Sequence, residues 1–329
     1  MKPASIVAAL LIGVMSTIAA TAHVLVTRDV YLMGTRAHLA TYAATRDAGL
    51  TTLESALRVL EETEAELSTW REDSAISRLN RHPVGAPWPA GPTLCQMFTA
   101  VYDWQAATAG AFDPAIGRLT GAWDIHGTGR IPSAEALTAA RAASGMARLA
   151  FDRPGCTLTR RADVALDVGA FGKGEALDRV ETALGSGPWM ISLGGQVSTG
   201  GPAPDDSPWT IEVAHPLERH RPHLRLLVRE GSLSTSAGSE RDLQVDGTRV
   251  AHHLDPRTGR PATFTGSVTV WHRRGLAADA LSTALYVMGP EEGMRWADAH
   301  GLAAGYLIPE RGKVRLEATR AFRALIAPE

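Results

Sequence analysis

The stretch that most constrains the fold of this chain is ALDVGAFGKGEALDR, residues 165–179. An apolar lead-in runs into three closely spaced glycines, and residues 175–184 then repeat apolar side chains at helical spacing. Glycines let the backbone pass close to a ligand, the start of a helix attracts anions, and Lys173 adds positive charge there. The spacing matches neither the dinucleotide fingerprint nor the Walker loop, and many such turns are glycine-rich for packing alone. The stretch therefore predicts strand, turn and helix, and leaves a phosphate site and a packing turn both open.

Length and charge exclude some classes of protein. A chain of 329 residues can bury a large core as one domain or as two closely packed ones. The net charge of -2, without a long basic run or an acidic tail, argues against a general nucleic-acid binder. We therefore expect no nucleic-acid partner.

The first residues have the pattern of an export signal. Lys2 precedes an apolar run, residues 6–20, that is short for a membrane span, and Ala20-Thr21-Ala22 is a small-x-small cleavage site. The pattern predicts a signal peptide over residues 1–22, a mature domain over 23–329 and a periplasmic location. An uncleaved inner-membrane anchor is the alternative. No cysteine adjoins the cleavage site, so we expect no lipidation there.

The two cysteines of the chain, Cys95 and Cys156, are far apart in sequence and resemble no metal-ligand pair. In an oxidising compartment they could form a disulfide, whereas buried free thiols are the other interpretation. The sequence does not decide between them.

The spacing of apolar residues predicts both helices and strands along the chain. Helices are expected over 49–67, after Ser74, and over 93–108, 133–144, 175–184, 277–288 and 291–299. Strands are expected within 23–45 and 147–166, at 189–193, 209–215, 224–229 and 268–271, and near the C-terminus. Residues 82–92 and 121–132 are predicted loops, 231–238 a Ser/Gly turn, and 163–195 a β-α-β unit.

Some polar residues suggest chemistry when taken together. Asp279 and Thr283 stand one helical turn apart and share a face, although a helix-terminal charge and a hydroxyl bonded to its own helix explain them singly. A diphosphate ester needs a hard cation, oxygen ligands and nearby donors, which this pair and the turn at 169–174 could supply. Asp113, before a proline, is either an Asx-turn residue or a ligand contact.

The order of the motifs resembles a known family. The segments are MGT at 33–35, LSTWREDSAISRLN at 67–80, GAFDP at 110–114, LDVGAFGKGEALD at 166–178, LGG at 193–195, HHLDPRTG at 252–259 and ADALSTAL at 278–285. Each is short, but together and in this order they resemble the FAD:protein FMN transferase (ApbE) family over nearly all of the mature chain.

The resemblance implies an α+β fold of the ApbE-like, T-fold-related kind, with mixed sheets flanked by helices and two intimately packed lobes that have the site between them. It also implies a secreted or periplasmic enzyme that takes FAD as substrate with Mg²⁺. Such an enzyme splits the diphosphate, passes the FMN phosphoryl group to a Ser or Thr of a periplasmic or membrane-associated acceptor protein, and releases AMP. By motif, it implies Ala170 (through its carbonyl), Asp279 and Thr283 as metal ligands, His253 and Asp279 as catalytic residues, and Met33, Ser68, Thr69, Trp70, Asp113, Lys173 and His253 as FAD-binding residues.

Several details stay open at this point. His253 is expected to take the proton from the acceptor hydroxyl or to orient it, and Asp255 either orients His253 or closes the Asp-Pro turn. Two residues depart from the family pattern: Gln196 stands where an acidic residue commonly follows the Gly-Gly pair, and Ser239 where an aromatic one is common.

Two other functions compete with the transferase. An FAD diphosphatase would use water as the nucleophile at the same site and release FMN and AMP. A periplasmic flavin-binding module without turnover would not need the Asp279/Thr283 pair.

Overall fold

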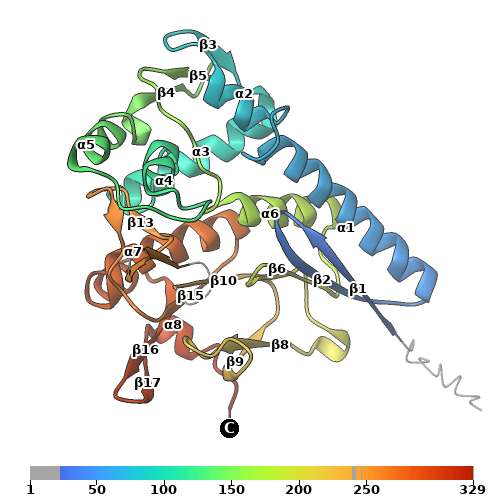
Figure 1. The fold of residues 1–329 in the computed structure, drawn as a ribbon. Coiled ribbons are helices and arrows are strands. Elements are labelled where there is room, and N and C mark those ends of the chain that lie inside the picture. Colours follow the sequence, from blue (N-terminus) through green and yellow to red (C-terminus); the bar gives the residue numbers. More distant parts are fainter. Residues whose placement is uncertain (1–22, 239–241, 246, 329) are drawn as a thin grey trace, which may run out of the picture.

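The computed structural model describes residues 23–238, 242–245 and 247–328. Its centre is an eight-stranded antiparallel sheet with the strand order β1-β2-β6-β7-β10-β15-β16-β17 (Figure 1). The strands are β1 (Val24–Leu32), β2 (Thr35–Ala43), β6 (Trp189–Leu193), β7 (Gln196–Thr199), β10 (Gly231–Ala237), β15 (Ser267–His272), β16 (Ala303–Glu310) and β17 (Lys313–Ala318).

Helices cover one face of this sheet. They are α1 (Arg46–Leu67), α6 (Gly172–Leu184) and α7 (Gly275–Ala299). The side chain of Thr45 caps α1 by accepting from the N–H of Ala48, and the apolar stripe of α1 packs with α6 on strands β2 and β6. Helix α7 packs on β15 and β16 through its own apolar face. Both α6 and α7 therefore have one side against the sheet.

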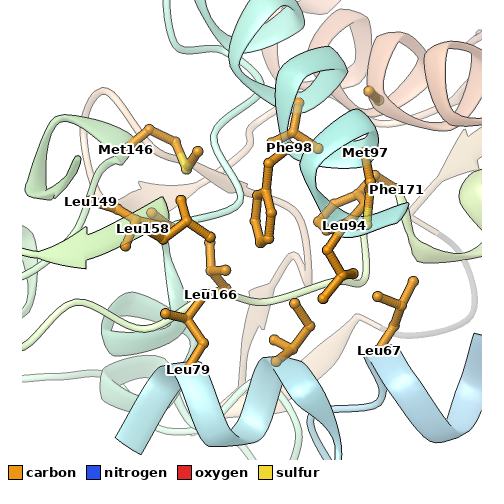
Figure 2. Packing of buried hydrophobic residues seen from close by; sticks show 14 of the residues in the cluster. Leu67, Leu79, Leu94, Met97, Phe98, Met146, Leu149, Leu158, Leu166 and Phe171 are labelled. Carbon is orange, nitrogen blue, oxygen red and sulfur yellow. The ribbon is translucent and has the colours of Figure 1, made fainter. Parts of the chain in front are cut away.

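The other side of α6 and α7 meets a second lobe (Figure 1). This lobe contains α2 (Ala75–Arg81), α3 (Gly91–Ala107), α4 (Gly117–Trp123), α5 (Ala134–Ala142), a short 3-10 helix (Met146–Arg148), and the small sheet β3 (Pro87–Pro89), β5 (Thr157–Arg160) and β4 (Leu149–Asp152). Its core surrounds Phe98 and joins Phe171, at the start of α6, to residues of α3 (Figure 2). Helix α7 thus belongs to both cores, and α6 is joined to the second core by Phe171, its N-cap residue.

The opposite face of the large sheet is covered by a hairpin and by α8 (Arg320–Arg323). The hairpin consists of β8 (Trp209–Ala214) and β9 (Pro222–Val228), with the 3-10 turn Pro204–Asp206 before it. Two smaller hairpins, β11 (Leu243–Val245) with β12 (Thr248–Val250) and β13 (Leu254–Asp255) with β14 (Arg260–Pro261), complete the fold. The predicted α+β class, with mixed sheets flanked by helices, is confirmed.

Cys95 and Cys156 form a disulfide. Their Cα atoms lie 5.4 Å apart and 61 residues separate them in sequence, so the bond joins α3 to the turn before β5. The sequence left open whether these cysteines are bonded or free, and the structure shows a disulfide within the second lobe.

Some predicted elements are wrong. Residues 231–238 are not a turn, because 231–237 form β10 in the middle of the large sheet, paired with β7 and β15. Residues 163–195 are not a β-α-β unit: segment 164–168 pairs with no strand, and the N–H groups of Leu166 and Asp167 donate to Asn80 and Pro114 instead. The short strand β7 was not predicted at all.

Other boundaries moved less. Helix α4 continues to Trp123 into the predicted loop 121–132, and β3 lies in the predicted loop 82–92. The two helices expected at 277–288 and 291–299 form one element, kinked where Gly289 has a φ of 74° before Pro290. Among the described residues, no helix combines the length and the apolar character that a membrane crossing requires. The predicted signal peptide and Ser239 lie outside the described residues.

Candidate functional site

A cavity of about 810 Å³ opens where the two lobes meet. The β1–β2 and β6–β7 turns and the end of β10 form one wall, and the starts of α6 and α7 form another. This volume lies within the roughly 300–1,000 Å³ that small-molecule and cofactor sites occupy. Six of the predicted site residues line it: Asp113, Ala170, Lys173, His253, Asp279 and Thr283.

Four residues predicted for FAD lie outside this lining, in the described part of the chain. Met33 occupies the β1–β2 turn with a φ of 51°, two residues before the lining residue Thr35. Ser68 accepts a hydrogen bond from the N–H of Trp70 at 3.2 Å, so Ser68, Thr69 and Trp70 form a local turn after α1. Trp70 is exposed, and its ring lies 5.4 Å from that of the lining residue His126. Met33 and Trp70 are thus near lining residues, and the role of all four residues remains a prediction.

Asp279 is the most completely held polar group of the site. The side chain is buried on α7, and its two carboxylate oxygens accept from the Lys173 ammonium at 3.1 and 3.2 Å. The N–H of Gly174 donates to Oδ2 at 3.2 Å, and the Ser234 hydroxyl lies 3.4 Å from Oδ1. The anion at the start of α6 in this structure is thus the carboxylate of Asp279 itself.

The predicted pairing of Asp279 with Thr283 follows helix geometry. Both side chains point from α7 into the cavity lining, because residues four apart share a helix face. Ala170 lines the same cavity just before α6, where it offers its carbonyl oxygen. One carboxylate, one hydroxyl and one carbonyl are all oxygen donors, which are the ligands that Mg²⁺ prefers in proteins.

His253 enters the cavity from the segment before β13. Its carbonyl accepts from the N–H of Ala262 at 2.8 Å, and its ring lies 4.4 Å from the ring of Tyr286 on α7. The centroid of the His252 ring is 3.9 Å from that of His253. Contact with two rings limits the orientations that the His253 imidazole can adopt.

A carboxylate that the sequence did not single out supports this pair of histidines. Asp242 accepts from the backbone N–H of His252 at 3.0 Å and contacts its Nδ1 at 2.9 Å. Burial raises the pKa of Asp242, but His252 and Arg249 outweigh burial and hold the pKa below its ordinary value. Asp242 is therefore charged at neutral pH and orients His252.

Asp255 does not serve His253 in this structure. Its carboxylate accepts from the backbone N–H of Arg257 at 2.9 Å and from the guanidinium of the same residue at 3.0 Å. Its carbonyl accepts from the N–H of Gly259. The geometry favours the turn-closing role over the orienting role.

Asp113 lines the cavity, yet its carboxylate accepts hydrogen bonds from backbone N–H groups of the protein itself. It accepts from the N–H of Ala115 at 2.9 Å, which makes an Asx-turn, and from the N–H of Met146 at 3.0 Å. Burial raises the pKa of Asp113, while these donors act in the opposite direction. These bonds give Asp113 a structural role in the turn, and the predicted FAD contact stays a prediction.

Other residues that line the cavity were not predicted from the sequence. Asp167 accepts from the N–H of Gly169 at 2.8 Å and contacts His126 Nε2 at 2.8 Å. Burial tends to raise the pKa of Asp167, but His126 and the Gly169 N–H have the larger, opposite effect and hold the pKa below its ordinary value. Ser234 was hidden in the supposed turn, although alternation of serines at 232, 234 and 236 is a strand signal.

No group of three or more His, Cys, Asp or Glu side chains gathers as a metal site within the described residues. A Mg²⁺ site does not need one, because this ion is commonly held by one or two carboxylates together with substrate phosphates and water. The donor set of Ala170, Asp279 and Thr283 therefore fits Mg²⁺ better than it fits zinc, which is bound by Cys and His.

The fold and the site together define an α+β protein with a nucleotide-sized cavity, a cluster of oxygen donors and an adjacent lysine, Lys173. The ApbE family model matches residues 33–306, and the chain belongs to the ApbE family.

The relatives agree with this assignment. The "FAD:protein FMN transferase" of Klebsiella pneumoniae (strain 342) is 30% identical over 258 residues, which cover 75% of this chain and 73% of the relative. The apo crystal structure of Pseudomonas stutzeri flavinyl transferase ApbE matches with a TM-score of 0.82 and 30% identity, covering 93% of this chain and 98% of that one. The Thermotoga maritima ApbE protein matches with a TM-score of 0.84 and 26% identity, covering 92% and 100%.

Proposed function

We propose that this protein is an FAD:protein FMN transferase. It splits the diphosphate of FAD, attaches FMN through a phosphoester to a Ser or Thr of an acceptor protein, and releases AMP. The observation that carries the proposal is the meeting of Lys173, Asp279 and Thr283 in one cavity of about 810 Å³. The names of the relatives support FAD as substrate and a protein as acceptor.

Mg²⁺ is the metal we propose for the reaction. Ala170, Asp279 and Thr283 would hold it through a carbonyl, a carboxylate and a hydroxyl. When bound, it supplies positive charge against the diphosphate and against the charge that develops on the leaving AMP.

The side chains of the chain itself have separate tasks in this proposal. Lys173 is held beside Asp279 by its ion pair and directs its ammonium toward the phosphates. His253, whose ring contacts those of His252 and Tyr286, accepts the proton of the acceptor hydroxyl or fixes the orientation of that hydroxyl.

We also propose that the protein acts in the periplasm. The signal-like pattern of residues 1–22 supports export, with a cleaved signal peptide or, as the alternative, an inner-membrane anchor. The Cys95–Cys156 disulfide supports the same location, because disulfides persist in oxidising compartments. The acceptor is then a periplasmic or membrane-associated protein.

The test uses residues 23–329 incubated with FAD and Mg²⁺, with and without a Thr-bearing acceptor. AMP is measured by chromatography and the acceptor by mass spectrometry. Release of AMP with an FMN-sized gain in acceptor mass, both lost on chelation, is the expected result. AMP and free FMN without a mass gain with any acceptor would replace the transferase by a diphosphatase, and intact bound FAD would replace it by a carrier.

Two variants of the same helix sharpen this test. Asp279→Asn removes the buried carboxylate of the site, whereas Asp298→Asn removes an exposed carboxylate near the end of α7. We expect AMP release to fall at least 100-fold in the first variant and to stay within twofold of wild type in the second. Equal activity in both variants would contradict the placement of the metal site.

A further inference from the structure

Gly275, the first residue of α7, is held by two side chains from neighbouring elements. Asp178 of α6 accepts from the N–H of Gly275 through Oδ1 at 2.6 Å and from the N–H of Leu276 through Oδ2 at 3.0 Å. Gln196 of β7 donates from Nε2 to the carbonyl of Gly275 at 2.9 Å. Asp178 is 4% exposed and Gln196 is completely buried, so neither contact competes with bulk water.

The orientation of the Gln196 amide is determined by its partners. Its Nε2 also donates to the Ser232 hydroxyl at 3.0 Å, so both hydrogens of the amide are used. The carbonyl of Gly275 can only accept, which means that the side chain opposite it must be a donor. A glutamate at position 196 has no N–H to donate, and its carboxylate form would place an acceptor against this carbonyl.

The start of α7 also touches α6 directly. A Cβ atom on Gly174 would lie 2.2 Å from the carbonyl oxygen of Gly275, and a Cβ on Gly275 would lie 2.6 Å from the carbonyl oxygen of Gly174. The same Gly174 donates its N–H to the carboxylate of Asp279, one turn further along α7. A shift of Gly275 therefore changes the place of Asp279 relative to α6.

We propose that Asp178 and Gln196 are positioning residues that hold the first turn of α7, so that Asp279 and Thr283 present their oxygens together to Mg²⁺. This inference rests on the proposed function, because it assigns a purpose to the metal site proposed there. Neither residue touches FAD or the metal in this scheme. Both act through the backbone of Gly275 and Leu276.

The amide of Gln196 and the carboxylate of Asp178 bind opposite polar groups of Gly275. The Gln196 amide donates to the backbone carbonyl of this glycine, and the Asp178 carboxylate accepts from its N–H. Both polar groups of this glycine are therefore satisfied by side chains. The pair therefore works as one clamp, in which each side chain needs the other to fix Gly275.

The test measures how FAD binding depends on Mg²⁺, by titrating Mg²⁺ and following the quenching of flavin fluorescence. The variants are Asp178→Ala, Asp178→Asn and Gln196→Glu, and the transfer rate is measured at saturating Mg²⁺. We expect the half-saturating Mg²⁺ concentration to rise at least tenfold in Asp178→Ala and Gln196→Glu, with kcat at saturating Mg²⁺ within threefold of wild type. Asp178→Asn retains one acceptor oxygen and should recover part of the affinity.

A control separates positioning from general loss of stability. Ser133→Ala removes the N-cap of α5, where the Ser133 hydroxyl accepts from the N–H of Ala136 at 3.2 Å. This variant should lower Tm and leave the Mg²⁺ dependence unchanged. If Asp178→Ala does not fold, Gln196→Glu, which keeps the size of the side chain, carries the test alone.

The outcomes distinguish this inference from the function on which it rests. If wild type binds FAD without any dependence on Mg²⁺ and releases no AMP, the proposed function fails and the clamp has no purpose. If wild type shows both properties and the folded variants keep its half-saturating Mg²⁺ concentration within twofold, the clamp alone is overturned.

Discussion

The close approach of α6 and α7 allows a prediction whose sign is unusual. Replacing glycine by alanine inside a helix ordinarily stabilises a protein by about 0.5–1 kcal/mol, because glycine loses more backbone freedom on folding. Gly174 lies in the first turn of α6, where a Cβ would meet three backbone atoms of α7 at 2.2, 2.5 and 2.6 Å. Backbone atoms cannot rotate away, so Gly174→Ala must push the two helices apart.

The size of the effect follows from these distances. Ordinary contacts of a Cβ begin at 3.4 Å, so the helices must separate by roughly 1 Å. Overpacking of this kind costs about 1–3 kcal/mol, and for a chain of this size each kcal/mol lowers Tm by roughly 2–4 °C. A displacement of about 1 Å at catalytic groups costs about 100-fold in rate. We therefore expect a moderate loss of stability and a much larger loss of AMP release.

Gly121 provides the matched control. It lies in α4, is exposed, and a Cβ there would meet nothing within 4 Å. Gly121→Ala should raise Tm slightly and leave AMP release unchanged, while Gly174→Ala should lower both. Calorimetry and the AMP assay on the two purified variants decide the matter. A Tm for Gly174→Ala at or above that of wild type, with AMP release within threefold, would refute the argument from helix contact.

Three further predictions concern other parts of the molecule. Replacing Cys95 and Cys156 by serine should cost up to about 4 kcal/mol of unfolding free energy in urea, because the bond closes a loop of 61 residues; an unchanged midpoint would contradict this. Burial lowers the pKa of His272 below its unfolded value of about 6.5, so the unfolded chain takes up the proton first and stability falls as pH decreases from 7 to 5. His272→Gln should flatten that decline in denaturation curves recorded across this pH range, and an equally steep curve would count against it. Lys173→Met should leave the Asp279 carboxylate without its ammonium partner and lower Tm by several degrees in thermal scans; an unchanged Tm would show that the ion pair contributes little.

Local patterns were enough to predict the helices that carry the site. The repeat of apolar residues in α1, α6 and α7 follows from one face being buried, and the spacing of four placed Asp279 and Thr283 together. The kink at Gly289 was visible as a gap between two predicted helices, because proline cannot continue a helix without a break. Properties that arise within one element were therefore accessible from the sequence.

The central strand β10 was missed for a physical reason. Glycine and serine are typical of turns, yet Ser234 and Ser236 face α7 and share the hydroxyl of Ser282, each at 3.0 Å. Small hydroxyl residues are favoured here because the strand must pass beside Asp279 and still satisfy its polar groups. Only the tertiary arrangement reveals this need, since the residues involved lie more than 40 positions apart in sequence.

The support of the site escaped prediction for the same reason. The glycine turn and Lys173 indicated an anion at the start of α6, but the sequence could not show that a carboxylate of the protein lies there. The bonds from Asp178 and Gln196 to Gly275 join residues 97 and 79 positions apart. Such contacts depend on how α6, β7 and α7 cross, which no local pattern encodes.

The ion pair of Lys173 with Asp279 has a consequence for how the site is prepared. A carboxylate that is 3% exposed is costly to keep charged without a partner, and here Lys173 and the Gly174 N–H provide the compensation. The ammonium also lies 3.3 Å from the carbonyl of Gly169, so it has a second acceptor on the same wall of the cavity. In the proposed function, a cation held by Asp279 would take over part of the compensation that Lys173 provides, because both neutralise the same carboxylate. The flexible side chain of Lys173 would then be available to a phosphate while it remains bonded to Gly169, so that a single lysine would stabilise the site both without and with its ligands.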